Sequence, residues 1–176
     1  MSAMNHPDER SLRLGLLLAG GGARVRRMAA TAPVGAPLLD GLSSEGAPRA
    51  LLETATRLAD NEARTVLDRV TAAGWQWRVP GDEAYPKLLA ATSDPPLGLF
   101  VRGRLDESAT VAVVVSRKAT PYGLQVARLL GEELGASGVT VVSGMARGVD
   151  EAAHRGAIEV GGRSWAVWGT GPDQVY

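Results

Sequence analysis

Three short apolar runs stand between residues 110 and 168: TVAVVV at 110–115, VTVV at 139–142 and SWAVW at 164–168. The first is a continuous run dominated by β-branched residues, as expected of a parallel strand covered by helices on both faces. Each run leads directly into glycine, small or charged residues. The runs therefore predict three parallel strands, each ending in a loop that can carry function.

The segments between these runs carry helix signals. Thr120 and Pro121 supply an N-cap hydroxyl and a proline at the first helical position, and this helix is predicted to run to Gly135. Asp150 is placed to cap a second helix, which the glycine pair at 161–162 ends. The stretch 110–176 thus predicts strand, helix, strand, helix, strand, which is an α/β fold with a parallel sheet.

The three strand ends are expected to meet at one edge, because crossovers between parallel strands are right-handed and bring the helix N-termini to the same side. Backbone N–H groups at glycines and positive side chains are what a phosphate group binds. The residues of this kind that follow the strands are Gly144, Gly148, Gly169, Gly171, Arg117, Lys118 and Arg147. This edge is therefore predicted to bind a phosphate-bearing ligand.

Two familiar nucleotide fingerprints are absent. The pattern Gly-x-Gly-x-x-Gly needs a third glycine at 25 or at 174, where the chain has Val25 and Gln174. The P-loop pattern Gly-x-x-x-x-Gly-Lys-Ser/Thr is also missing. A nicotinamide dehydrogenase and a P-loop nucleotidase thus lose their main support.

An ordered set of motifs does resemble a known family. YPKLL at 85–89, DPP at 94–96, SGMARGVD at 143–150 and GTG at 169–171, with a Ser-Arg pair at 116–117, resemble the DNA-processing protein A family, DprA, also called Smf. The resemblance implies a Rossmann-like fold and a bacterial, cytoplasmic, non-enzymatic protein without cofactor or metal. Such a protein binds single-stranded DNA entering the cell and loads the RecA recombinase onto it during natural transformation.

The resemblance extends the candidate site. The DNA- or phosphate-binding residues it implies are Ser116, Arg117, Lys118, Tyr122, Gly123, Ser143, Gly144, Ala146, Arg147, Gly148, Asp150, His154, Gly169 and Gly171. Arg117 is the leading candidate, because it follows an apolar strand and its guanidinium fork suits bidentate phosphate binding.

Other interpretations of these residues stay open. Lys118 and Arg147 fit solvated loop charges equally well, and Asp150 fits a helix cap better than a catalytic acid. His154 falls one turn inside the second helix, where it is expected to orient the loop through a hydrogen bond. With His6 as the other histidine and no ligand cluster near it, a metal site is not expected.

The chain departs from the family pattern in two places. Val115 stands where the family has glycine, which puts a Cβ where the backbone would approach a ligand. The sequence stops at Tyr176, where the family continues, so about half of the Rossmann-like domain is expected to be missing. The resemblance implies that the missing half helps to form the family's dimer and its contact with RecA. A gene fragment, a degenerate copy and a truncated version all fit.

Residues 1–73 are predicted to form a small helical domain, and residues 74–176 the Rossmann-like domain. Gly20 and Gly22 lie between an apolar segment and a basic one, which resembles a helix-hairpin-helix or SAM-like unit that binds a DNA phosphate or serves packing alone. The same glycines resemble the oxyanion loop of patatin-like hydrolases, but no nucleophile elbow accompanies them. Residues 49–73 show one long helical pattern, and residues 75–79 alternate like a strand whose two tryptophans favour core packing over base stacking.

Composition sets looser limits. The chain has 19 basic and 19 acidic residues, so DNA binding would depend on local clustering of charge and not on a global field. It has no cysteine, which excludes disulfides and thiolate metal sites. Asp8 and Glu9 stand where a signal peptide needs basic residues. Two rival functions remain: a nucleotide phosphoribohydrolase of the same broad superfamily, whose paired glycines and glutamate are missing near 169–173, and a fragment that binds nothing.

Overall fold

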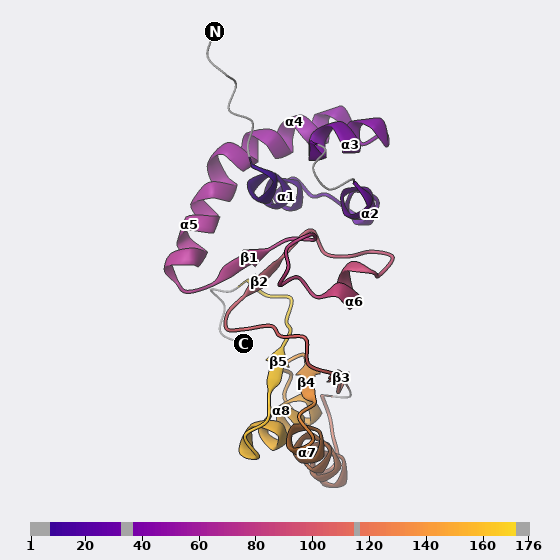
Figure 1. Ribbon diagram of the computed structural model, residues 1–176, viewed down its shortest axis with the longest axis vertical. Coiled ribbons are helices and arrows are strands. Elements are labelled where there is room, and N and C mark those ends of the chain that lie inside the picture. Colours follow the sequence, from indigo (N-terminus) through magenta and orange to yellow (C-terminus); the bar gives the residue numbers. More distant parts are fainter. Residues whose placement is uncertain (1–7, 33–36, 115–116, 172–176) are drawn as a thin grey trace. The chain divides into compact units, whose positions relative to one another are not determined.

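The structure is a computed structural model that describes residues 8–32, 37–114 and 117–171. The chain forms two compact units, residues 1–105 and 106–176. Figure 1 shows helices and one pair of strands in the first unit and an α/β arrangement in the second. Within the described residues, none of the helices has the length and apolarity needed to span a bilayer.

Short helices build most of the first unit. The predicted helical hairpin is confirmed: Gly20, with a φ of 80°, ends the first helix, and the Gly21 N–H donates to the Leu16 carbonyl at 2.8 Å. The core of the unit gathers Leu12, Leu16, Leu42 and their neighbours. The helices are α1 (Glu9–Leu18), α2 (Ala23–Thr31), α3 (Leu38–Ser44), α4 (Arg49–Leu58), a π-helical segment η1 (Ala59–Ala63), α5 (Arg64–Ala72) and α6 (Lys87–Ala90).

The long helix predicted over residues 49–73 is present but interrupted by η1. Helix α1 crosses close to this segment at Gly15. A Cβ added to Gly15 would overlap the carbonyl oxygen of Ala55 and lie 3.1 Å from the backbone nitrogen of Ala59. Single π-helical turns of this kind widen a helix by one residue. Periodicity in the sequence did not reveal the interruption, since the buried alanines continue through it.

Two strands, β1 (Gln76–Arg78) and β2 (Leu99–Val101), pair antiparallel in the first unit. Trp77 is buried, as predicted, and its indole nitrogen donates to the carbonyl of Arg10 in α1 at 3.1 Å. The Arg10 guanidinium donates in return to the Trp77 carbonyl at 2.8 Å. These bonds join the strand pair to the helices, and the compact unit that contains them ends at residue 105.

The second unit is a three-stranded parallel sheet with the order β3-β4-β5. This confirms the Rossmann-like α/β class. The elements are β3 (Thr110–Ala112), α7 (Pro121–Ala136), β4 (Thr140–Ser143), α8 (Val149–Glu159) and β5 (Ser164–Ala166).

The expectation that helices cover both faces of β3 is wrong for the described residues. Because the strand order follows the chain order and the crossovers are right-handed, α7 and α8 lie on the same face of the sheet. Val113 packs beneath them, whereas Val114 is 69% exposed. β3 is also an edge strand, and all three of its residues are exposed. A run of β-branched residues occurs both in strands covered on two faces and in exposed edge strands, so the run alone did not distinguish the two.

The helices α7 and α8 pack backbone against backbone. A Cβ at Gly131 of α7 would overlap the carbonyl oxygen of Ala153, and one at Gly135 would lie 2.9 Å from that of Ala157. Gly156 of α8 is equally close to the carbonyl of Arg128. The close approach fixes how the two helices, and the loops that precede them, lie relative to each other.

Candidate functional site

The loops that follow β3, β4 and β5 lie at one edge of the sheet, because the three strands are parallel neighbours. The described residues of these loops are 113–114 and 117–120 after β3, 144–148 after β4 and 167–171 after β5. These loops contain all the predicted site residues that do not belong to a helix or strand, except Ser116. Ser116 and Val115 lie outside the described residues. The edge predicted from the order of elements is thus the place where these residues meet.

The positive side chains of this edge face solvent. Arg117, Lys118 and Arg147 are all exposed. Arg117 and Arg147 make no ion pair with any residue that the structure describes, whereas Lys118 has a partner. Tyr122, in the first turn of α7, is 76% exposed. The edge therefore presents two cations and one aromatic ring that the rest of the unit does not use.

The start of α7 follows the sequence prediction. The Thr120 hydroxyl accepts a hydrogen bond from the Gly123 N–H at 3.1 Å, and Pro121 is the first helical residue. The Gly123 amide therefore serves the cap and does not face a ligand. Of the predicted pair Tyr122 and Gly123, only the tyrosine side chain is available at the surface.

The loop after β4 contains an unusual backbone conformation. Met145 has a φ of 62°, the one positive value for a non-glycine residue in the described part of the chain. Such a conformation costs on the order of 1 kcal/mol and persists only where neighbouring contacts hold it. Gly148, at φ 100° and ψ −124°, ends the loop in a region open only to glycine.

Asp150 has a different role from the predicted helix cap. The N-cap of α8 is Gly148, and Asp150 lies in the first turn with its side chain turned back to the loop. Its Oδ2 atom accepts hydrogen bonds from the Gly144 N–H at 3.1 Å and the Ala146 N–H at 3.4 Å. The amide of Gly144, which was predicted to bind phosphate, and the amide of Ala146 therefore bind a carboxylate of the protein itself.

A buried layer of polar side chains lies under the same loop. The Ser143 hydroxyl donates to the Val113 carbonyl at 2.6 Å, and the Ser164 hydroxyl donates to the Val141 carbonyl at 3.0 Å. His154 Nδ1 lies 2.6 Å from the Ser164 oxygen, which leaves Nδ1 as the donor. Ser143 thus joins β4 to the residue that follows β3, and His154 joins helix α8 to β5.

His154 gives the second unit a pH dependence. Burial lowers the pKa of His154 below its usual 6.5, against the opposing effect of the Asp150 charge. His154 therefore binds a proton more readily in the unfolded chain than in the folded one. The free energy of unfolding is at its highest above about pH 6.5, and it decreases as the pH falls below that value. We expect urea titrations to show a loss of stability between about pH 7 and pH 5 that is smaller in His154→Asn.

Asparagine retains a donor for Ser164 but does not titrate, so it separates protonation from the loss of a hydrogen bond. His6→Gln is the matched control, because His6 is the other histidine of the sequence. An unchanged pH profile in His154→Asn would contradict the assignment of the titration to this residue.

The third loop is open. Gly169 and Gly171 are exposed, and a Cβ placed on Gly169 would meet no other atom within 4 Å. Val167, one residue past the end of β5, is 59% exposed. This loop therefore leaves room for a ligand to approach its backbone.

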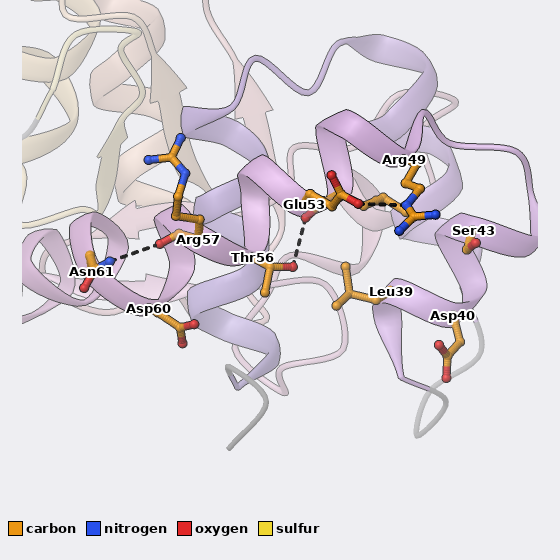
Figure 2. A pocket seen from close by; sticks show the side chains of 10 residues that line it. Leu39, Asp40, Ser43, Arg49, Glu53, Thr56, Arg57, Asp60 and Asn61 are labelled. Atoms are coloured by element: carbon orange, nitrogen blue, oxygen red, sulfur yellow. Dashed lines mark hydrogen bonds and ion pairs between the residues drawn. The ribbon is translucent and has the colours of Figure 1, made fainter. Parts of the chain in front are cut away.

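A separate hollow of 620 Å³ lies in the first unit, between α3 and the α4–η1 helix. Figure 2 shows its charged and polar lining, with Arg49 and Glu53 paired at 2.7 Å. None of the predicted site residues lines it. No group of three or more His, Asp or Glu side chains arranged to hold a metal occurs in the described part of either unit.

The profile of the family "DNA recombination-mediator protein A" matches residues 76–176, which is more than half of the chain. The chain belongs to this family. The chain is similar to Protein Smf of Escherichia coli K12, with 46% identity over 101 residues that cover 56% of this chain and 27% of that protein. The DNA processing protein DprA of Streptococcus pneumoniae is 39% identical over 97 residues, covering 54% of this chain and 34% of that one.

The solved structure of the Streptococcus pneumoniae DprA matches this member of the family over both units. The superposed region covers 97% of this chain and 56% of the Streptococcus pneumoniae chain, with a TM-score of 0.68 and 27% sequence identity. The present chain thus spans about a third or less of the length of the two relatives and about half of the solved chain.

Proposed function

We propose that this chain contributes a single-stranded DNA-binding surface to a recombination mediator, and that it holds the DNA without covalent chemistry. The observation that carries the proposal is the pair of exposed arginines, Arg117 and Arg147, at the strand-end edge of a chain in this family; neither makes an ion pair with a residue that the structure describes. An arginine guanidinium donates two parallel hydrogen bonds to one phosphate group, so two of them can follow a phosphodiester chain.

Tyr122 favours a single strand over a duplex as the ligand. An exposed ring beside a phosphate-binding edge stacks on an unpaired base, and such stacking is worth about 1–3 kcal/mol per base. In a duplex the bases are already stacked on one another and do not offer their faces. The edge thus combines the two features that sequence-independent binding of single strands requires.

The finer parts of the proposal rest on the family resemblance of the sequence motifs. We propose that the complete protein acts in the cytoplasm during natural transformation and loads RecA on incoming DNA. A homodimer would form where the C-terminal half is present. Ser116, Lys118, Gly148, Gly169 and Gly171 stay in the proposed DNA-binding set. Ser143, Gly123 and Gly144 are assigned to support of the fold because their polar groups are engaged.

The rival enzymatic function receives less support. A phosphoribohydrolase needs a carboxylate that can reach the ribose, and Asp150, the carboxylate that the sequence placed at this edge, is 6% exposed and holds two loop amides. We therefore expect no release of nucleobase from nucleoside monophosphates. Release that depends on Asp150 would favour the enzyme.

A fluorescence-anisotropy titration tests the main proposal, with labelled oligo-dT against the same oligonucleotide paired with oligo-dA. We expect tighter binding of the single strand, without preference among mixed sequences. Two or three phosphate contacts give a slope of log affinity against log salt of about −1.4 to −2. Equal binding of duplex and single strand, or no binding of either at low salt, would refute the proposal.

A further inference from the structure

A side chain of the protein itself stabilises the turn after β4. Met145, in the left-handed conformation, stands between Gly144 and Ala146, and both of these neighbours donate their N–H groups to the same oxygen of Asp150. A residue forced into an unfavourable φ needs contacts that over-determine it. The two hydrogen bonds on either side of Met145 are contacts of that kind.

The space around the carboxylate is filled. Asp150 is 6% exposed, and a Cβ added at Gly144 would lie 3.0 Å from its Oδ2 atom. His154 lies on the same face of α8, one turn further, and is buried as well. The carboxylate is thus a built-in part of the turn and has no open path to a ligand.

The charge of Asp150 has a second consequence. It lies under the loop that carries Arg147 and places a negative charge close to the path of a polyanion, where the local dielectric is lower than in water. Within the same turn of α8 the other carboxylate, Glu151, is paired with Arg155 at 2.9 Å. Asp150 therefore stabilises the shape of the turn and at the same time opposes the binding of phosphate.

We infer that Asp150 is a positioning residue that acts as an internal anion: it takes the two amides that would otherwise bind phosphate, fixes the turn that presents Arg147, and lowers the affinity for DNA. The inference rests on the proposed DNA-binding function and deepens it. It assigns DNA contact at this loop to the Arg147 side chain and the amides beyond Ala146, and not to those of Gly144 and Ala146.

Two substitutions separate shape from charge. Both hydrogen bonds end on one oxygen, so Asp150→Asn can keep them while it removes the charge. We expect Asp150→Asn to bind oligo-dT about two- to tenfold more tightly at low salt, with a smaller gain at high salt because the removed repulsion is screened. Asp150→Ala loses the acceptor, and we expect it to bind about tenfold more weakly than the native chain.

Hydrogen–deuterium exchange of the peptide that contains residues 143–148 gives a readout without DNA. The amides of Gly144 and Ala146 should be protected in the native chain and in Asp150→Asn, and should exchange faster in Asp150→Ala. Weaker binding of oligo-dT by Asp150→Asn, with normal protection of the two amides, would overturn the inference. It would mean that the negative charge of Asp150 favours binding and does not oppose it. Equal protection in Asp150→Ala would overturn it as well.

The exchange experiment also distinguishes this inference from the proposed function. If no version of the chain binds DNA but Asp150→Ala alone loses protection, the positioning role stands and the DNA-binding proposal fails. If DNA binds and neither variant alters affinity or protection, the inference fails and the proposed function stands. Circular dichroism of both variants shows whether the sheet and helices are retained.

Discussion

Arg117→Ala should weaken the binding of oligo-dT about tenfold or more. A hydrogen bond to a charged group contributes about 1.5–3 kcal/mol, and Arg117 is expected to donate two of them to one phosphate. Because the Arg117 side chain is exposed and unpaired among the described residues, its removal breaks no contact of the folded unit. The loss should therefore appear in affinity and not in stability. Fluorescence anisotropy at two salt concentrations measures both the affinity and its salt dependence.

The salt dependence makes this prediction specific. Loss of one phosphate contact should reduce the slope of log affinity against log salt by about 0.7 for a single strand. Arg117→Lys should retain the slope but lose part of the affinity, because an ammonium group cannot bind a phosphate with a planar fork. Arg49→Ala, which removes the same charge from a side chain 91% exposed in the helical unit, is the matched control. If Arg49→Ala weakened binding as much as Arg117→Ala, the effect would be one of net charge.

The sequence predicted the elements of the second unit because their signals are local. A threonine followed by proline marked the start of α7, and the glycine pair at 161–162 marked the end of α8, where the Gly162 N–H donates to the Ala157 carbonyl. The meeting of the strand ends followed from parallel pairing and right-handed crossovers. These inferences need only the order of elements along the chain.

The contacts inside the site were not predictable in the same way. A carboxylate in the first turn of a helix is favourable there wherever its side chain points, so the pattern gave no sign that Asp150 bonds to Gly144 and Ala146. The left-handed conformation of Met145 has no sequence signal, because methionine is not a residue type that favours it. Both features depend on how closely the loop and α8 approach each other, which is a property of the tertiary structure.

The same dependence explains the error over β3. The run at 110–115 has the composition of a fully covered strand, but burial of a strand is decided by the elements that lie beside it and not by its own residues. In the described chain no strand pairs with the outer side of β3, and both helices cover the opposite face from Val114. The prediction of buried strand residues holds on the face that the helices cover, where Val113 and Val141 belong to the core.

Gly131→Ala should destabilise the second unit by about 2–3 kcal/mol, because the new methyl group has no space at the contact of α7 with α8. Its Cβ would overlap the Ala153 carbonyl oxygen and lie 3.1 Å from the Ala157 nitrogen, and both are backbone atoms that move only with the helix. The helices would have to separate, and the loops before them would move apart. Urea unfolding followed by circular dichroism measures the loss, and we expect weaker binding of oligo-dT to accompany it.

Gly123→Ala is the control within the same helix. Its Cβ would lie 3.4 Å from the Thr120 hydroxyl, an ordinary contact, and alanine favours a helix over glycine, so we expect a change of no more than about 1 kcal/mol in either direction. Equal stability of the two variants would mean that the helices can separate without cost. In that case the spacing of α7 and α8 would not determine where Arg117 and Arg147 stand, and the arrangement of the binding edge would need another cause.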